Sequence, residues 1–166
     1  NRPLRVLVIG NSFGRDIANV ILETYDVDQF SLVYRNEITT CSMLADDYRK
    51  LFEASSLILF ASDYYDQACN EEISSDSPYK DKTYFIGNKH FGYNLNWLMR
   101  IPRGERQYLR NSFDSRLIVE ENLIRKSLPE ESYISLFDFL VSEDGILITD
   151  HSGMLISDDR AHLTLS

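Results

Sequence analysis

The stretch LRVLVIGNSFGRD, residues Leu4 to Asp16, decides the fold, because within it an aliphatic run passes through a glycine-flanked turn into a helical pattern. The run Leu4–Gly10 is too short for a buried helix and is rich in valine, so it predicts a central parallel strand. After the turn, apolar residues recur at helical spacing, at Ile17, Val20, Ile21 and Leu22. A strand followed by a helix is the opening unit of an α/β fold.

The rest of the chain repeats this alternation. Further stretches predict strands at Phe30–Tyr34, Ser56–Ser62, Lys82–Asn88 and Ser132–Leu140. Helical patterns lie at Leu44, Tyr48, Leu51 and Phe52, and across Ser115–Leu128. Because right-handed crossovers place helices on both faces of a parallel sheet, we predict a three-layer α/β/α sandwich with a five-stranded parallel sheet and a flavodoxin-like layout.

The length and charge of the chain narrow its class. A chain of 166 residues that is 43% hydrophobic is long enough for one core, so we expect a single domain over residues 1–166. Its 26 acidic and 17 basic residues give a formal charge of -9, which would repel a phosphate backbone, so nucleic acid is not an expected partner. No run of 18 apolar residues occurs, and no membrane span is expected within the chain. Two polar stretches, Asn70–Lys82 and Arg100–Gln107, are predicted to be surface loops.

The cysteines and histidines do not predict a metal site. Cys41 and Cys69 lie in different predicted elements and lack a metal-binding spacing, and whether they form a disulfide stays open. The chain has three histidines and neither an HExxH nor a CxxC motif. We therefore expect neither a metal nor another cofactor.

Ser12 stands between two glycines at the strand-to-helix junction and admits three interpretations. A phosphate loop is disfavoured, because the segment lacks the GK[ST] of a Walker motif and has Arg15 where a GxGxxG motif has its third glycine. As a simple turn residue, Ser12 would be the N-cap of a helix starting near Gly14. As a nucleophile, its hydroxyl would lie above the sheet, where the positive end of the helix dipole favours an oxyanion.

A serine nucleophile needs a base, and the base needs a carboxylate to orient it. Near the C-terminus Asp159 and His162 are three residues apart, so one short turn presents both side chains to the same place. Asp158 is the alternative acid. His151 beside Asp150 is the rival base, but neighbouring residues on an extended loop point apart.

The two ends of the chain together carry a family resemblance. GNSF at Gly10–Phe13 and DRAHLT at Asp159–Thr164 resemble the first and last blocks of the SGNH (GDSL-type) hydrolases, with Asn11 in place of the family's aspartate. These two sequence blocks resemble even more closely those of the SGNH domains fused to bacterial membrane-bound acyltransferases, which O-acetylate cell-surface polysaccharides. The resemblance implies acyl transfer, with Ser12 as nucleophile, His162 as base and Asp159 as the orienting acid.

The same resemblance implies partners and a location. An acyl donor, a glycan acceptor and a membrane-embedded acyltransferase domain are the expected partners. The chain is then a fragment of a larger membrane-bound acyltransferase. We expect it to lie in the periplasm, attached to the inner membrane through a portion outside this sequence.

The chain departs from the family pattern at the oxyanion donors. The segment after the second predicted strand has no glycine, and the segment after the third has no asparagine. The remaining candidates are the backbone N–H of Ser12 and the side chain of Asn88. Losing one oxyanion donor typically lowers kcat by about 10²–10³-fold.

Substrate-binding candidates follow the predicted strands, because ligands bind at the carboxyl ends of parallel strands. These candidates are Asn11, Tyr64, His90 and Phe91. Two other functions stay open. One is a free-standing SGNH esterase or deacetylase with water as the acceptor, and the other is a non-catalytic glycan-binding module with a degenerate oxyanion hole.

Overall fold

The computed structural model describes residues 3–44, 46–62, 66–92, 95–157, 159 and 161–164. The chain divides into two compact units. Unit 1 consists of Asn1–Gly87 and Asn122–Ile134, and unit 2 of Asn88–Glu121 and Ser135–Ser166. The expectation of a single domain over residues 1–166 stays a prediction.

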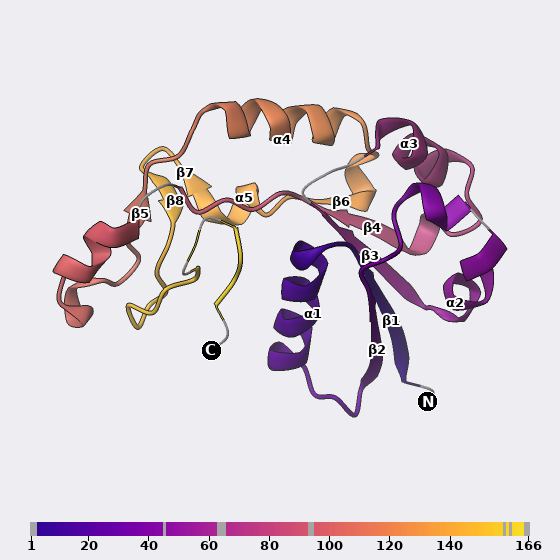
Figure 1. The fold of residues 1–166 in the computed structure, drawn as a ribbon, viewed down its shortest axis with the longest axis horizontal. Coiled ribbons are helices and arrows are strands. Elements are labelled where there is room, and N and C mark those ends of the chain that lie inside the picture. The colour runs from indigo at the N-terminus through magenta and orange to yellow at the C-terminus, as the bar shows by residue number, and fades with distance from the viewer. Residues whose placement is uncertain are drawn as a thin grey trace. The chain divides into compact units, whose positions relative to one another are not determined.

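Unit 1 is built on a five-stranded sheet in the order β2-β1-β3-β4-β6, in which every neighbouring pair is parallel (Figure 1). Its strands are β1 (Leu4–Ile9), β2 (Phe30–Arg35), β3 (Leu57–Ala61), β4 (Thr83–Ile86) and β6 (Tyr133–Ile134). The aliphatic run that opens the chain lies between β2 and β3. This strand order is that of flavodoxin-like folds, so the predicted sheet and layout are confirmed.

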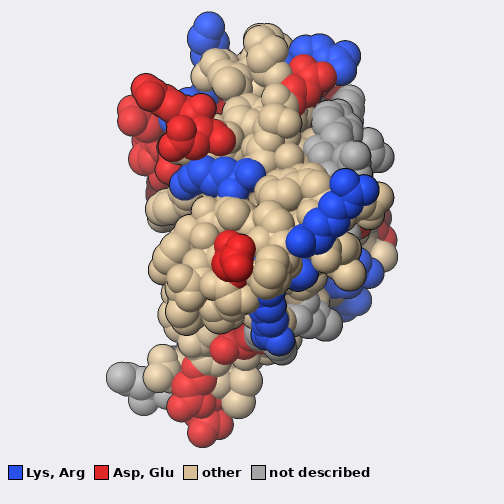
Figure 2. Space-filling model, turned by 90° about the vertical axis from the view of Figure 1, so that its left-hand side faces the viewer, with Lys and Arg blue, Asp and Glu red and all other residues tan. Residues whose placement is uncertain are grey.

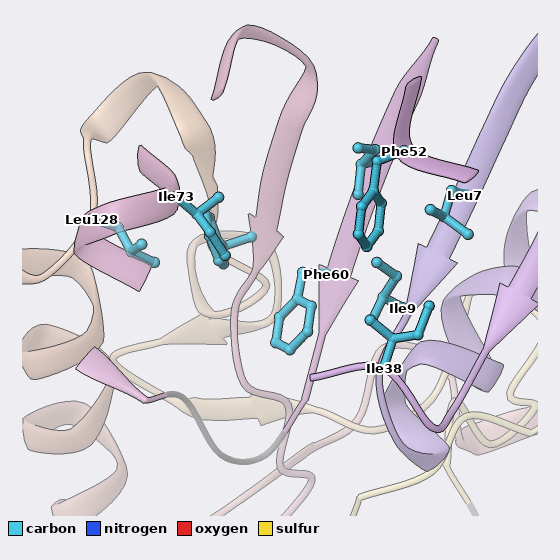
Figure 3. Packing of buried hydrophobic residues seen from close by; sticks show 9 residues of the cluster. Leu7, Ile9, Ile38, Phe52, Phe60, Ile73 and Leu128 are labelled. Carbon is cyan, nitrogen blue, oxygen red and sulfur yellow. The ribbon is translucent and has the colours of Figure 1, made fainter. Parts of the chain in front are cut away.

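Helices cover both faces of this sheet. The α-helices of the described residues are α1 (Ser12–Thr24), α2 (Arg49–Ala54), α3 (Gln67–Ser75), α4 (Arg116–Lys126) and α5 (Phe137–Leu140). On one face, side chains of β1, β3 and β4 pack with Phe52 of α2, Ile73 of α3 and Leu128 (Figure 3). Because successive side chains of a strand point to opposite faces, Val6 and Val8 face the other side, where α1 buries Phe13 and Ala18.

Two predicted boundaries were wrong. The strand expected over Ser132–Leu140 ends at Ile134, and Phe137–Leu140 forms α5, in which the N–H of Leu140 donates to the carbonyl oxygen of Leu136 (3.1 Å) and the N–H of Asp138 donates to the hydroxyl of Ser135 (3.3 Å). The loop expected over Asn70–Lys82 begins inside α3. The side chain of Asp66 accepts a hydrogen bond from the backbone N–H of Cys69 (3.0 Å) and caps this polar helix at its N-terminus.

Unit 2 contains a small antiparallel sheet that the sequence analysis does not predict. Its strands pair in the order β5-β8-β7, with β5 at Arg110–Asn111, β7 at Val141–Ser142 and β8 at Gly145–Leu147. Gly145 has a φ of 115°, and a Cβ there would lie 2.3 Å from the carbonyl oxygen of Asn111. Only glycine therefore permits this close pairing.

A disulfide joins Cys41, in the segment after β2, to Cys69 of α3, with their Cα atoms 5.1 Å apart. Ligand atoms of Cys41, Asp66 and Cys69 lie within 4.8 Å of one another. Because the two sulfurs are bonded to each other, these cysteines offer no thiolates to a metal ion. Among the described residues, no helix combines the length and apolar character needed to cross a membrane.

Candidate active site

Unit 1 places Ser12 at the first position of α1, directly after β1. The two intervening residues make the turn. Gly10 has a φ of 137°, and a Cβ there would lie 1.7 Å from the carbonyl oxygen of Ala61, so no larger residue fits. The side chain of Asn11 accepts the backbone N–H of Phe13 (3.0 Å) and is the N-cap. The interpretation of Ser12 as the N-cap was therefore wrong.

Tyr34, at the carboxyl end of β2, holds this turn from the neighbouring strand. Its hydroxyl donates to the carbonyl oxygens of Gly10 (3.1 Å) and Asn11 (2.8 Å). Burial raises the pKa of Tyr34, an effect that the positive charge of Arg15 opposes, so the hydroxyl keeps its proton as a donor. Sequence reasoning missed this residue, although a tyrosine that ends the strand beside β1 was the available signal.

A cavity of about 240 Å³ opens beside the turn, at the carboxyl ends of β1, β2 and β3. Its lining includes Asn11, Asn36, Thr40, Phe60 and Asp66. Ligands of parallel α/β sheets bind at this edge. Larger hollows of about 350 Å³ and 530 Å³ exist in unit 1, but their linings include none of the predicted site residues.

Unit 2 brings Asp159 and His162 together. Asp159 Oδ2 lies 2.6 Å from His162 Nδ1, while Oδ1 accepts the backbone N–H groups of Ala161 (2.6 Å) and His162 (2.7 Å). In the neutral ring, an Nδ1–H that donates to this carboxylate places the basic lone pair on Nε2. The three-residue separation of Asp159 and His162 therefore closes a turn that orients the imidazole.

Hydrogen bonds also set the charge of Asp159. Partial burial raises its pKa, but the backbone N–H groups of Ala161 and His162 and the His162 ring together outweigh burial and lower the pKa well below its ordinary value. The carboxyl is therefore ionised at neutral pH.

The base of the turn is held by residues that sequence reasoning missed. Ser157 is fully buried, and its hydroxyl donates to the carbonyl oxygen of Asp159 (2.9 Å). The N–H of Thr164 donates to the carbonyl oxygen of Ile156 (3.0 Å). A serine two residues before the aspartate was the available signal for the first of these contacts.

In the rival pair of Asp150 and His151, the carboxylate of Asp150 binds neighbouring residues of its own turn. The carboxylate of Asp150 accepts the N–H and hydroxyl of Ser152 (2.8 Å each) and the N–H of Met154 (2.9 Å). The pKa of Asp150 is lowered, mainly by the hydrogen bond from the Ser152 hydroxyl. Asp150 thus shapes a tight turn, which leaves Asp159 and His162 as the stronger pair.

The segment after β4 holds three predicted site residues. Asn88 Oδ1 accepts the N–H of Lys89 (3.1 Å), so its oxygen serves the turn. His90 Nδ1 accepts the N–H of Gly92 (3.0 Å), which places the ring proton of the neutral form on Nε2. Phe91 has no exposed surface and packs with Leu98 and other core residues of unit 2. The prediction that Phe91 binds substrate does not fit such a side chain.

Some predicted residues are not covered by these observations. Tyr64 and Asp158 lie outside the described residues. Ser12 belongs to unit 1, whereas Asp159 and His162 belong to unit 2. Their joint action in a triad therefore stays a prediction.

Charged side chains are scattered over the face of the molecule seen in Figure 2. Among the described residues of that face, acidic side chains gather mainly at the upper left, and Lys and Arg side chains lie at the top, across the middle and at the lower right.

Comparisons with known proteins bear on the fold. No protein-family model matches the chain, and no curated protein sequence matches it significantly. The chain is similar to the solved structure of the lipopolysaccharide acetyltransferase periplasmic domain of Salmonella ser. Paratyphi A, with a TM-score of 0.62 and 17% sequence identity. The match covers 99% of this chain and 78% of that chain. It supports the α/β fold.

Proposed function

We propose that this chain is an SGNH-type domain that transfers an acyl group, most simply acetyl, to a cell-surface polysaccharide. The observation that carries the proposal is the 2.6 Å contact between Asp159 Oδ2 and His162 Nδ1, in a turn whose backbone N–H groups hold the carboxylate. Carboxylate-oriented imidazoles activate serine nucleophiles in acyl transfer. Ser12, at the first position of α1, is the proposed nucleophile.

The proposed reaction has two halves. In the first, Ser12 Oγ attacks the acyl carbonyl while His162 Nε2 takes the hydroxyl proton, and the proton then passes to the leaving group of the donor. In the second, His162 takes a proton from a glycan hydroxyl, which attacks the acyl-serine ester and releases Ser12 with its proton restored. Asp159 stabilises the imidazolium that forms in each half.

The negative oxygen formed during attack needs hydrogen-bond donors. The N–H of Ser12 belongs to the first turn of α1, where backbone amides lack intrahelical acceptors and the helix dipole is positive. The amide group of Asn88 is the second candidate, because the turn uses only its oxygen. The proposed substrate-binding residues are Asn11, which lines the cavity of unit 1, and His90 of unit 2.

Two observations support a periplasmic location. The structural neighbour is the periplasmic domain of a lipopolysaccharide acetyltransferase. The chain also carries a disulfide between Cys41 and Cys69, and such bonds persist in oxidising compartments such as the bacterial periplasm. We propose that a membrane-embedded acyltransferase domain outside this chain supplies the acyl group at the inner membrane.

The first test is the activity of Ser12→Ala on p-nitrophenyl acetate. The parent should release nitrophenol and form an acetyl adduct on Ser12 that mass spectrometry detects. Ser12→Ala should lose the adduct and about 10³-fold or more of the rate, because the nucleophile is gone. Ser31→Ala, on the exposed side of β2, is the matched control and should keep the parent rate. Unchanged turnover in Ser12→Ala would overturn the serine mechanism.

The same assay separates the alternatives. If a glycan acceptor leaves the rate and products unchanged, the domain is an esterase that uses water. The missing glycine and asparagine after β2 and β3 favour a third outcome, in which the chain binds glycan without turning over esters. Glycan binding by both the parent and Ser12→Ala, with no adduct in either, would identify that binding module.

A further inference from the structure

We propose that Lys89 is a positioning residue for the Asp159–His162 pair. Lys89 lies in the segment after β4, and only 2% of the residue is exposed. Its Nζ donates a hydrogen bond to the backbone carbonyl oxygen of Ala161. All four residues belong to unit 2, and the expected effect on activity rests on the proposed function.

The contact acts on one particular peptide group. The carbonyl of Ala161 and the N–H of His162 belong to the same planar peptide unit. Lys89 Nζ donates to the carbonyl at one end, and the N–H at the other end donates to Asp159 Oδ1 (2.7 Å). Both polar ends of the unit are held, so it cannot rotate without breaking a charge-assisted hydrogen bond.

The direction of the His162 ring follows from this peptide unit. The peptide unit ends at the Cα of His162. The orientation of the unit therefore sets the direction in which the His162 side chain leaves the backbone. The ring must then meet Asp159 Oδ2, 2.6 Å from Nδ1. A rotated peptide would move the ring away from the carboxylate, and misplacement by about 1 Å costs roughly 10²-fold in rate.

The burial of Lys89 indicates that its hydrogen bond to the turn of His162 contributes to the structure. A lysine is almost never fully buried unless its ammonium has polar partners, because removing the charge from water is costly. The hydrogen bond from the Lys89 ammonium to the Ala161 carbonyl offsets part of this cost, and Ala161 lies in the turn that carries His162. The long side chain of Lys89 therefore links the segment after β4 to Ala161, at a sequence separation of 72.

Lys82 is a matched control within the same chain. Its Nζ also donates to backbone carbonyls, those of Phe52 (2.6 Å) and Ser55 (2.7 Å), and burial lowers its pKa. Those carbonyls lie at the end of α2 in unit 1 and not in the turn of His162. Loss of Lys82 should therefore lower stability without changing the His162 ring.

The experiment compares Lys89→Met with Lys82→Met in two readouts. The first is the downfield proton resonance of His162 Nδ1–H, which reports its hydrogen bond to Asp159 independently of activity. The second is turnover of p-nitrophenyl acetate. In Lys89→Met the resonance should be lost, and kcat should fall by about 10–100-fold with KM within about twofold of the parent. In Lys82→Met both should match the parent.

If Lys89→Met does not fold, Lys89→Gln replaces it in the experiment. The glutamine side chain keeps a polar end but is one bond shorter than that of lysine. This variant should show the same loss of the resonance. A retained resonance with unchanged kcat in the folded variant would overturn the positioning role. If Ser12→Ala keeps full turnover, the proposed function fails, and the resonance alone still decides the role of Lys89.

Discussion

At the scale of single residues, the geometry of the proposed nucleophile depends on neighbours that do no chemistry. Gly10 permits the close approach of the turn to Ala61, and Asn11 caps α1. The hydroxyl of Tyr34 donates to the carbonyls of Gly10 and Asn11, and the Asn11 carbonyl also accepts the N–H of Arg15 (3.2 Å), the first hydrogen bond of α1. These contacts place Ser12 at the start of α1 before any substrate arrives.

We therefore predict that Tyr34→Phe weakens both the fold and the site. Removing one hydroxyl leaves two partly buried carbonyls without this donor, which should lower the free energy of unfolding by about 1–2 kcal/mol. The turn should loosen, and kcat for p-nitrophenyl acetate should fall by about tenfold. Urea unfolding and steady-state kinetics measure the two effects. Tyr84→Phe on β4 is the control and should change neither. Equal stability and kcat in Tyr34→Phe would contradict this role.

At the scale of elements, the turn that carries Asp159 and His162 has hydrogen bonds of its own. Its carboxylate, Asp159, accepts from the backbone and from the ring of His162. These hydrogen bonds are stronger when Asp159 is ionised, so we expect the turn to be less stable in acid.

The sign of that response follows from the lowered pKa of Asp159. An unfolded aspartate has a pKa of about 3.9, so the stabilising contribution of Asp159 is complete above that pH. It is lost only as the pH falls through the lower pKa of the folded state. We expect the ¹³C resonance of the Asp159 carboxyl to show no protonation step near pH 4. A midpoint near 4 for Asp159 would contradict the observed hydrogen bonding.

At the scale of the whole molecule, a covalent bond supplements the packing. The disulfide between Cys41 and Cys69 closes a loop with a sequence separation of 28. It ties the segment after β2 to α3, and Cys41 also lines the cavity beside the Ser12 turn. Reduction should therefore affect stability and the shape of the cavity together.

We predict that the double variant Cys41→Ser/Cys69→Ser unfolds at a lower denaturant concentration. A loop of this length corresponds to about 3–4 kcal/mol of stabilisation, because the cross-link restricts the unfolded chain. Adding a reductant should shift the parent toward the variant and leave the variant unchanged. Identical unfolding midpoints for the oxidised parent and the variant would show that the bond contributes nothing to stability.

The sequence by itself determined the features that depend on near neighbours along the chain. Aliphatic runs predicted all five parallel strands, and their alternation with helices predicted the sandwich. The spacing of Asp159 and His162 predicted a turn that presents both side chains, because a hydrogen bond across three residues needs little beyond local geometry. Local patterns were less informative at boundaries, as α5 in place of the end of a strand shows.

Only the tertiary structure decided the contacts between residues far apart in sequence. It paired Cys41 with Cys69, brought Tyr34 to the Ser12 turn, joined Lys89 to Ala161 and built the sheet of β5, β8 and β7. It also buried Phe91, which the sequence analysis assigned to substrate. The physical reason is that such contacts form only after the chain has folded back on itself, so the side chains that meet depend on strand order and packing rather than on spacing along the chain.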